Sequence, residues 1–384
     1  MKNNPPFSYW EKELLPSDCD VCIVGGGFTG SWTAWHLAQM APGLRIVVLE
    51  NQVISRGAST RNAGFLCYGS PSEILEDIDT MGESAAIELV QQRYIGLQKL
   101  KNTVPPSAAG ISWTGGKELF AHCHAELFEN VSDNLDQLND ALRSAIGQRP
   151  FAHADMERSP HQFERGLKCI NIAGEGQVQP AKLLKYISDM NQTQGVRLCE
   201  GLQVTAIRKG ERNLVVQTDR SLNLRCRKVL IATNGFYRRL FPETMDVIPA
   251  RNTISILKPS KAFKLNGNFH ANKGYIYFRS VNGQLLIGGG RHWAAEEESS
   301  DEMLTNEFIK TRLMNFVREN LSGDRLEWKE VQSWSGILGI GPHKSPILSW
   351  RDDHILAAVR LSGMGVALSP VIGQKAAAML LKRL

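Results

Sequence analysis

Three glycines at a fixed spacing follow the first apolar run of the chain and could bind phosphate. The run, residues 20–24, is rich in β-branched side chains and predicts a buried parallel strand. Gly25 permits a tight turn, Gly27 lets backbone N–H groups approach a pyrophosphate, and Gly30 lets the next helix pack closely on the strand. That helix, expected over residues 31–40, adds partial positive charge at its N-terminus. The pattern therefore predicts a dinucleotide-binding turn.

An acidic residue follows the second strand, residues 47–49, at the position that such a turn requires. Glu50 stands 20 residues after Gly30. A carboxylate there can accept hydrogen bonds from both hydroxyls of an adenosine ribose and would repel a 2′-phosphate. We therefore expect FAD or NAD at this turn. Its further cofactor contacts are expected to be Phe28, Thr29 and Asn51.

A loop of small and polar residues, 56–64, comes next and continues into an apolar stretch. Such a loop suits close approach of the backbone to a ligand, with polar side chains as donors. The cofactor contacts expected in this loop are Ser59, Thr60, Arg61, Asn62, Ala63 and Gly64.

Two later stretches have the same character. A buried strand over residues 228–231 ends in small residues, and the glycine-spaced turn 363–365 leads into a C-terminal helix expected over residues 371–384. A helix start of this kind attracts anions. The cofactor contacts expected from these stretches and from a preceding hairpin are Val204, Ala232, Thr233, Asn234, Gly235, Gly363, Met364, Gly365, Val366 and Ala367.

The candidate substrate contacts lie in and after a strand over residues 275–279. Tyr277 and Arg279 alternate on this strand and so share a face. Arg279 could bind a carboxylate through its planar fork, or could instead support the structure at a strand end. His292, in the run Arg291 to Trp293 after three glycines, and Lys344, in a loop, are further candidates. The catalytic residues expected are therefore Tyr277, Arg279, His292 and Lys344.

The hydrophobic pattern of the rest of the chain predicts the helices and strands that would position these candidate residues. Residues 1–16 are expected to form an arm over the surface. Helices are expected over 72–103, 130–146, 180–194 and about 301–320, and strands over 253–257, 285–287 and 355–359, with a hairpin over 204–216.

Composition is that of an ordinary globular enzyme. The 44 basic and 39 acidic residues are scattered, which disfavours a nucleic-acid partner. No apolar run approaches the ~18 residues that a membrane span needs, and the N-terminus has no signal-peptide pattern. Seven widely spaced cysteines indicate a reducing compartment, so we expect a cytoplasmic protein.

Two cysteine patterns are interpreted as structural. Cys19 and Cys22 lead into the first strand, where residues three apart should point to opposite faces. The run from His122 to His124 is expected on a strand, and no further Cys/His cluster completes a metal site. No metal is predicted.

Taken together, the ordered blocks resemble the FAD-dependent D-amino-acid oxidase superfamily, which includes glycine oxidase and sarcosine oxidase. The resemblance covers nearly the whole chain. The blocks are residues 25–30 with Glu50, 57–64, 176–180, 231–235 and 363–365. Residues 8–10, the 57–64 loop and residues 277–279 ahead of two glycines lean toward the γ-glutamylputrescine oxidoreductase branch.

The resemblance implies an α/β fold, in which a Rossmann-like FAD-binding domain is interleaved with an α+β substrate domain built on a largely antiparallel sheet. The FAD-binding domain would gather residues 1–80, 170–240 and 330–384, and the substrate domain residues 81–169 and 241–329. The implied chemistry is oxidation of an amine or amino acid at its C–N bond to an imine, by hydride transfer to flavin N5. O₂ or another electron acceptor would reoxidise the flavin.

The chain departs from the sarcosine-oxidase branch in three places. That branch has a lysine in the strand occupied here by residues 285–287 and another just past its C-terminal glycine turn, where this chain has residues 366–368. Its flavin-linking cysteine is also missing, because no cysteine follows Cys226. We therefore expect non-covalent FAD. A tRNA wobble-uridine-modifying flavoenzyme, an NAD-dependent dehydrogenase and a non-catalytic flavin-binding protein remain alternatives.

Overall fold

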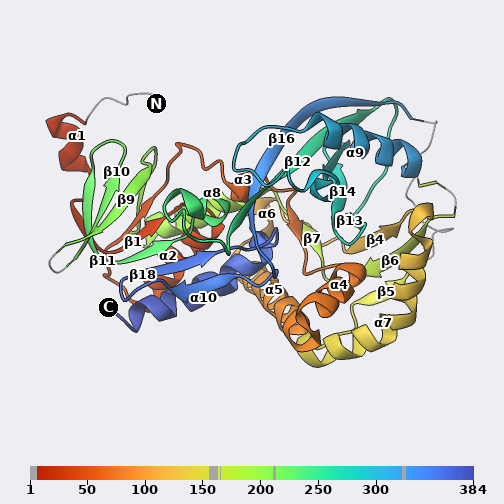
Figure 1. Cartoon of the computed structure of the whole chain (residues 1–384), viewed down its shortest axis with the longest axis horizontal. Coiled ribbons are helices and arrows are strands. Elements are labelled where there is room, and N and C mark those ends of the chain that lie inside the picture. Colours follow the sequence, from red (N-terminus) through yellow and green to blue (C-terminus); the bar gives the residue numbers. More distant parts are fainter. Residues whose placement is uncertain (1–6, 155–162, 165, 211–212, 322–325) are drawn as a thin grey trace. The chain divides into compact units, whose positions relative to one another are not determined.

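The computed structural model describes residues 7–154, 163–164, 166–210, 213–321 and 326–384 (Figure 1). The chain forms two compact units. Unit 1 consists of Met1–Thr60, Ala181–Pro249 and Leu338–Leu384, and unit 2 of Arg61–Pro180 and Ala250–Ile337. The domain limits expected at residues 80, 170, 240 and 330 do not coincide with these boundaries and stay a prediction.

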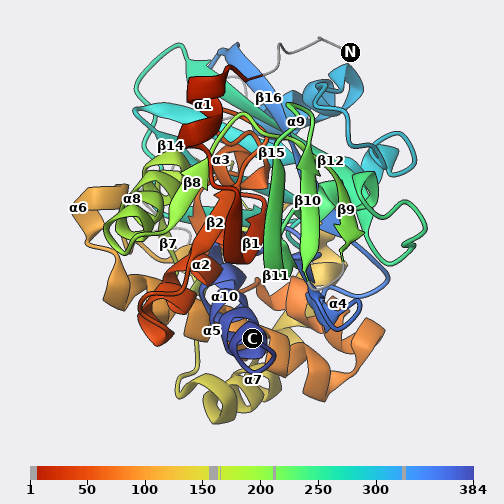
Figure 2. The same ribbon diagram turned by 90° about the vertical axis from the view of Figure 1, so that its left-hand side faces the viewer.

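Unit 1 is built on a mainly parallel sheet whose strand order is β17-β18-β11-β1-β2-β8. Figure 2 shows β11, β1, β2 and β8 side by side in this order. The parallel strands of this sheet are β1 (Asp18–Val24), β2 (Ile46–Leu49), β8 (Arg197–Cys199), β11 (Asn223–Ile231) and β18 (Ile355–Val359). The antiparallel strands β17 (Ile347–Trp350), β10 (Leu214–Thr218) and β9 (Val204–Lys209) complete it. The predicted βαβ start and the α/β class are confirmed.

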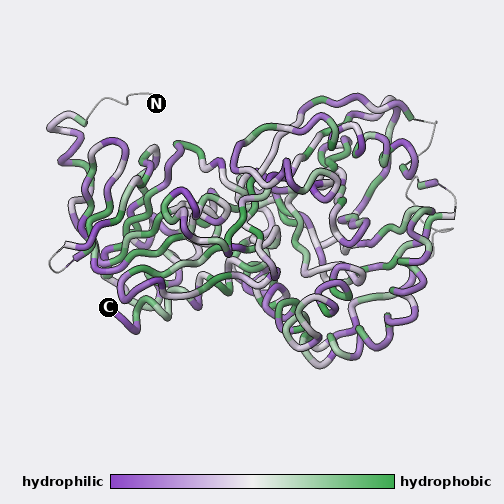
Figure 3. Tube along the Cα trace, viewed as in Figure 1, coloured by the Kyte–Doolittle hydropathy of each residue, from purple (hydrophilic) through white to green (hydrophobic). Residues whose placement is uncertain are grey.

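Strands β2 and β18 consist of apolar residues, and β1 and β11 end in apolar runs. Figure 3 colours the hydrophobic segments of the chain green. All residues of β2 and β18 are buried, as are the last four of β1. Such continuous burial requires cover on both faces of a parallel sheet. Helices α2 (Phe28–Met40) and α10 (Gly365–Leu381) pack together and against strands of this sheet.

An irregularity in β1 corrects the interpretation of Cys19 and Cys22. The N–H groups of Asp20 and Val21 both donate to the carbonyl of Arg45, at 2.9 and 3.2 Å. Cys19 and Cys22 both belong to the buried cluster that contains Cys226, although the register of β1 with β11 is unshifted from Asp18 to Val24. The prediction that they point to opposite faces is therefore wrong, because the strict alternation of side chains is interrupted at Asp20 and Val21.

The ends of the chain also differ from expectation. Helix α10 begins at Gly365 rather than at residue 371, and Pro370 lies inside it. Burial against α2 on both sides of Pro370 outweighs the lost backbone hydrogen bond. Near the start, Ser8 caps the short helix α1 (Tyr9–Leu14) in a capping box with Glu11, so part of the expected arm is helical. Residues 1–6 of that arm lie outside the described residues.

Unit 2 is built on a largely antiparallel sheet whose order is β16-β12-β15-β14-β13-β4-β6-β5. Its strands are β4 (Gly116–Phe120), β5 (Phe151–His153), β6 (Lys168–Ile172), β12 (Ile248–Pro259), β13 (Asn268–Ala271), β14 (Ile276–Val281), β15 (Gln284–Gly289) and β16 (Trp328–Ile340). Only the pairing of β13 with β4 is parallel among the registers described for this sheet. A small ribbon of β3 (Phe65–Leu66) and β7 (Gly176–Gln177) lies apart from it.

One face of the unit 2 sheet is apolar and packs on helix α9 (Glu307–Asn320), with Phe269, Phe278 and Phe316 in the shared core. The helices α4 (Pro71–Met81), α5 (Glu83–Thr103) and α7 (Ala125–Ile146) pack against one another. The remaining elements are α3 (Ala58–Arg61), α6 (Pro106–Ala109), α8 (Pro180–Thr193), η1 (His122–His124), η2 (Asn234–Arg239) and η3 (Arg291–Ala294). None of the helices in the described part of the chain combines the length and apolar character needed to cross a bilayer.

The run His122–His124 forms the 3₁₀ turn η1 and not a strand. This turn leads directly into α7, whose buried stripe includes Val131, Leu135 and Leu142. Helix α7 begins at Ala125, earlier than the predicted residue 130, and the 3₁₀ turn η1 directly precedes it. The expectation that His122 and His124 share one face of a strand is therefore wrong.

The close packing of α10 on α2 is tested by Gly373→Ala. A Cβ at this position would lie 2.8 Å from the Cβ of Trp32 and 2.9 Å from the backbone nitrogen of Thr33. Alanine raises helix propensity by about 1 kcal/mol, but crowding against backbone atoms costs about 1–3 kcal/mol, so we expect a net loss of stability of up to roughly 2 kcal/mol. Urea unfolding of Gly373→Ala and of the exposed control Lys375→Ala measures it. A stabilised Gly373→Ala would contradict the close approach.

Candidate functional site

The turn after β1 has room only for glycine. Gly25 has a φ of +109°, and a Cβ on it would lie 2.8 Å from the carbonyl oxygen of Ala232. A Cβ on Gly30 would lie 2.0 Å from the carbonyl oxygen of Gly25. The turn, the strand end and the helix start therefore touch through backbone alone, as predicted for a phosphate-binding loop.

Helix α2 presents its N-terminus without a side-chain cap of its own. Gly27 is the N-cap residue, and the N–H of Phe28 donates to Oγ of Ser59 at 2.9 Å. The next first-turn N–H groups, of Thr29 and Gly30, have no acceptor within the helix. An anion at this end would meet these N–H groups and the positive end of the helix dipole.

Glu50 lies beside the turn, and its carboxylate can accept further hydrogen bonds from a ligand. Its Oε2 accepts from the N–H of Gly26 at 2.9 Å and its Oε1 from the N–H of Gln52 at 3.2 Å. A carboxylate offers about four acceptor sites, so two remain for the hydroxyls of a ribose. Burial raises the pKa of Glu50, and the two N–H donors oppose that shift. Asn51, the next residue, is exposed and contacts Gln52.

A second helix start lies next to the first within unit 1. Ser362 and Gly363 adopt positive φ values of 48° and 86°, and Met364 is the N-cap residue of α10. The hydroxyls of Thr29 and Ser369 are 3.2 Å apart, so the first two turns of α2 and α10 are in contact. No local sequence pattern indicates Ser369, because its partner lies 340 residues away.

Asn234 ties the end of β11 to the end of β18. It has a φ of +47°, and its Oδ1 accepts from the N–H of Leu361 at 3.2 Å. Thr233, before it, has a buried hydroxyl without a hydrogen bond among the described residues. These residues hold the turn before α10 near the carboxyl ends of the parallel strands, where ligands of such sheets bind. Val204 is buried in β9, and Gly235, Val366 and Ala367 are buried near the two turns.

The residues expected from the 57–64 loop divide between the units. Ser59 and Thr60 belong to unit 1, and the rest to unit 2. Arg61 donates to the carbonyl of Ser335, and its own carbonyl accepts from Nε1 of Trp334 at 3.1 Å. Oδ1 of Asn62 accepts from the N–H of Gly64 at 2.8 Å. These bonds fix the loop's own shape, and cofactor contact by Arg61, Asn62, Ala63 and Gly64 stays a prediction.

The second face of the unit 2 sheet carries polar side chains. Tyr277, His270 and Glu118 are register partners across β14, β13 and β4 and therefore share a face. Arg279 and Asn268 are partners in the next such row. Tyr277 and Arg279 are predicted from the sequence, but Glu118, His270 and Asn268 are not, although a charged or polar side chain in an apolar strand indicates a specific partner.

The guanidinium group of Arg279 donates its hydrogen bonds to backbone and side-chain amide oxygens. It donates to the carbonyl of Ala63 at 2.6 Å, to Oε1 of Gln177 at 3.1 Å and to the carbonyl of Val178 at 3.2 Å. Burial lowers the pKa of Arg279 to about 10. This arrangement favours the structural alternative for Arg279 over a grip on substrate.

Tyr277 and Asn252 form a hydrogen-bonded polar pair in unit 2, and Arg291 lies nearby. The hydroxyl of Tyr277 accepts from Nδ2 of Asn252 at 2.8 Å. Gly288 leaves room for the ring of Tyr277, because a Cβ on residue 288 would lie 2.6 Å from that ring. Burial raises the pKa of Tyr277, and the nearby charge of Arg291 opposes that shift. Arg291 lies over the ring of Tyr275, with 4.9 Å between its guanidinium carbon and the ring centroid.

The other two candidates lie elsewhere. Nε2 of His292 is 2.9 Å from Nδ2 of Asn272, and burial, followed by the charges of Arg291 and Arg312, lowers the pKa of His292 to about 4. His292 is therefore neutral at pH 7. Lys344 belongs to unit 1, between β16 and β17.

The parallel sheet, the glycine turn, Glu50 beside that turn and the two helix starts have the geometry of a dinucleotide-binding unit of the Rossmann class. The family model described as "FAD dependent oxidoreductase" (DAO) matches residues 20–379, and the chain belongs to this family. The cofactor that the family implies is FAD, and the predicted resemblance is confirmed.

Relatives of known name are distant but match along most of their length. A "Probable oxidoreductase OrdL" of Rhizobium meliloti is 24% identical over 97% of this chain and 87% of its own. The "Gamma-glutamylputrescine oxidoreductase" of Escherichia coli is 24% identical, over 94% and 83%. The solved structure of glycine oxidase from Geobacillus kaustophilus covers 95% of each chain with a TM-score of 0.74 at 22% identity. It shows that the fold is shared, including the mixed α/β architecture.

The role of Glu50 is tested by Glu50→Gln, which keeps the size of the side chain but removes its charge. Charge-assisted hydrogen bonds contribute about 1.5–3 kcal/mol, so the affinity for FAD should fall by roughly 10- to 100-fold. Titration of flavin-free protein with FAD, followed by flavin fluorescence, measures it. The exposed neighbour Glu200→Gln is the matched control. Equal affinities of Glu50→Gln and wild type would place Glu50 away from the ribose.

Proposed function

We propose that the protein is an FAD-dependent oxidoreductase that oxidises the C–N bond of an amine or amino acid to an imine, with FAD held non-covalently. The observation that carries the proposal is the family match over residues 20–379, which spans both units. Relatives with this fold are named for amine and amino-acid substrates, among them glycine oxidase, L-amino acid deaminase and γ-glutamylputrescine oxidoreductase. Family membership favours FAD over the NAD-dependent alternative.

The residues of unit 1 would hold the cofactor. The first-turn N–H groups of α2 would bind the pyrophosphate, and Glu50 the ribose of the adenosine. The N-terminus of α10 offers partial positive charge for an electron-rich part of the flavin. The chemistry that FAD supplies when bound is removal of a hydride equivalent from the carbon bearing the amine, and water hydrolyses the resulting imine.

Substrate recognition is proposed for the group around Tyr277. Arg291 has no hydrogen bond or ion pair with a described residue, so its fork is available to a carboxylate. Tyr277 and Asn252 add a hydroxyl and an amide on the same side of the unit. We propose that Arg291 and Tyr277 bind a carboxylate of the substrate, while Arg279 holds the segments containing Ala63 and Val178 in place.

The class of reaction is tested with the purified protein. We expect it to be yellow and to release intact FAD when precipitated with acid, because the linking cysteine is missing. Under anaerobic conditions a panel of amines and of D- and L-amino acids should include compounds that bleach the oxidised flavin spectrum. Colour that stays with the precipitate would contradict non-covalent binding, and a panel without bleaching would contradict amine oxidation.

The two arginines are separated by Arg291→Lys and Arg279→Lys. Loss of a bidentate contact should cost Arg291→Lys about 1.5–3 kcal/mol in kcat/KM for a carboxylate-bearing substrate, seen mainly in KM. An amine without a carboxylate should be little affected. Arg279→Lys should lower the rates of flavin reduction with both substrates to a similar extent.

Stopped-flow flavin reduction with both substrates provides the comparison. If Arg279→Lys showed the carboxylate-specific loss and Arg291→Lys did not, the assignment of the two residues would be reversed. An equal loss with both substrates in Arg291→Lys would remove Arg291 from substrate recognition.

A further inference from the structure

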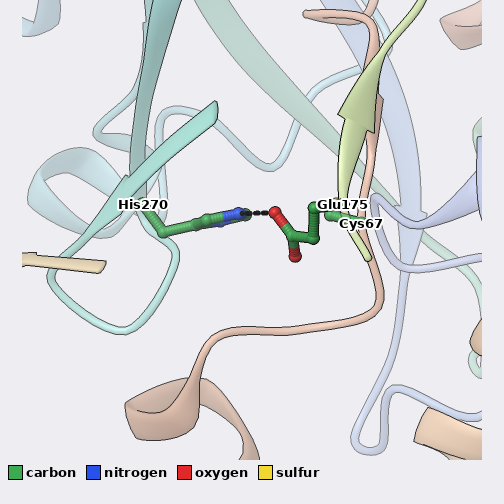
Figure 4. A group of neighbouring side chains, drawn as sticks. All are labelled: Cys67, Glu175 and His270. Carbon is green, nitrogen blue, oxygen red and sulfur yellow. Dashed lines mark hydrogen bonds and ion pairs between the residues drawn. The ribbon is translucent and has the colours of Figure 1, made fainter. Parts of the chain in front are cut away.

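A cysteine, a glutamate and a histidine of unit 2 meet in its interior, as Figure 4 shows. Cys67 follows β3, Glu175 precedes β7 and His270 lies in β13. Their thiol, carboxylate and imidazole donor atoms all lie within 4.8 Å of one another, and all three residues are buried. Nε2 of His270 is 3.0 Å from Oε2 of Glu175. Neither the cofactor site nor the substrate group described above uses these side chains.

The sheet leaves space for this cluster. His270 faces it from β13, and the neighbouring strand β4 has Gly116 two residues before Glu118, the register partner of His270. A Cβ on Gly116 would lie 2.1 Å from Oε2 of Glu175. The carboxylate therefore occupies the place that a side chain at residue 116 would take.

Glu175 has an acceptor that the protein does not satisfy. The residue is 0% exposed, and its Oε1 makes no hydrogen bond with a described residue. A buried carboxylate oxygen without a donor is costly, and such exceptions call for a specific partner. A cation coordinated through both oxygens of this carboxylate would give Oε1 the partner that it lacks.

The surroundings of the cluster are rich in carboxyl groups. Four are buried in the neighbourhood: Glu73, Asp77, Glu118 and Glu175. Nη1 of Arg93 lies 3.3 Å from Glu73, and Nη2 lies 3.9 Å from Asp77. The buried cationic side chains that face this group are Arg93 and His270. A divalent ion that displaces one proton from the thiol and one from the imidazolium leaves the net charge of this buried group unchanged, so its binding adds no uncompensated charge.

We propose that Cys67, Glu175 and His270 bind one divalent transition-metal ion of the zinc class. Sulfur, imidazole nitrogen and carboxylate oxygen are the donors that such ions take in proteins. Tetrahedral bonds of about 2.0–2.3 Å place donor atoms roughly 3.3–3.8 Å apart, so shifts of about 1 Å suffice here. The sulfur binds as thiolate and the imidazole as the neutral ring, and their protons pass to solvent as the ion enters.

The test uses Co²⁺ as the probe, because its d–d absorption lies at longer wavelengths than that of oxidised flavin. The full chain is produced in Co²⁺-supplemented medium and purified as the flavin-containing protein without chelators. We expect close to one Co²⁺ per chain by elemental mass spectrometry, with the intense d–d bands of tetrahedral coordination. Cys67→Ser and His270→Asn should each lower the bound metal by about tenfold or more.

The matched control removes the other thiol–imidazole group of unit 2, on the turn η1, where Cys123 is exposed. The double variant Cys123→Ser/His124→Asn should keep the metal and its spectrum. Metal lost in this control but kept in Cys67→Ser would mean adventitious surface binding and overturn the proposal. Wild-type protein without bound metal would also overturn it.

Two features keep the test decisive. Cys67→Ser is nearly isosteric, so it carries the test if His270→Asn fails to fold, and the flavin content of each variant reports on folding. Metal content and the cobalt spectrum do not depend on turnover. Failure of the metal proposal is therefore distinguishable from failure of the proposed function.

Discussion

The contact between α2 and α10 fixes the geometry on which the nucleotide site depends. Gly373 lets the two helices approach until their backbones touch, and the hydroxyls of Thr29 and Ser369 meet near the start of each helix. The first turns of both helices thus lie together at the carboxyl ends of the parallel strands. Each helix contributes partial positive charge, and two such ends beside one another form a stronger site for anionic groups than one alone.

The unit 2 sheet divides its two faces between stability and chemistry. Phenylalanine and aliphatic side chains cover the face that packs on α9, and this burial stabilises the unit. The other face carries tyrosine, histidine, arginine and glutamate at partner positions. Because each of these groups is costly to bury alone, the segments around Ala63, Glu175 and Val178 supply oxygens to them. Arg279 is satisfied in this way, which leaves the more open Arg291 for a ligand.

The errors of sequence interpretation have definite physical causes. Cys19 and Cys22 belong to one buried cluster because the alternation of β1 is interrupted at Asp20 and Val21, whose N–H groups share the carbonyl of Arg45. Helix α10 continues through Pro370 because packing against α2 outweighs one missing backbone bond. The run from His122 to His124 turns into α7 and does not form a strand. In each case a contact with a distant segment overrides a local preference.

The sequence by itself determined the local chemistry of this protein: the glycine turn, the position of Glu50, the apolar strands and the DAO family. These follow from spacing within short segments, where backbone geometry leaves few alternatives. Only the tertiary structure decided that Arg279 is engaged by Ala63 and Val178, or that Cys67, Glu175 and His270 meet. Such groupings join residues separated by 95 or more positions, and their formation depends on sheet register and packing, which no single segment encodes.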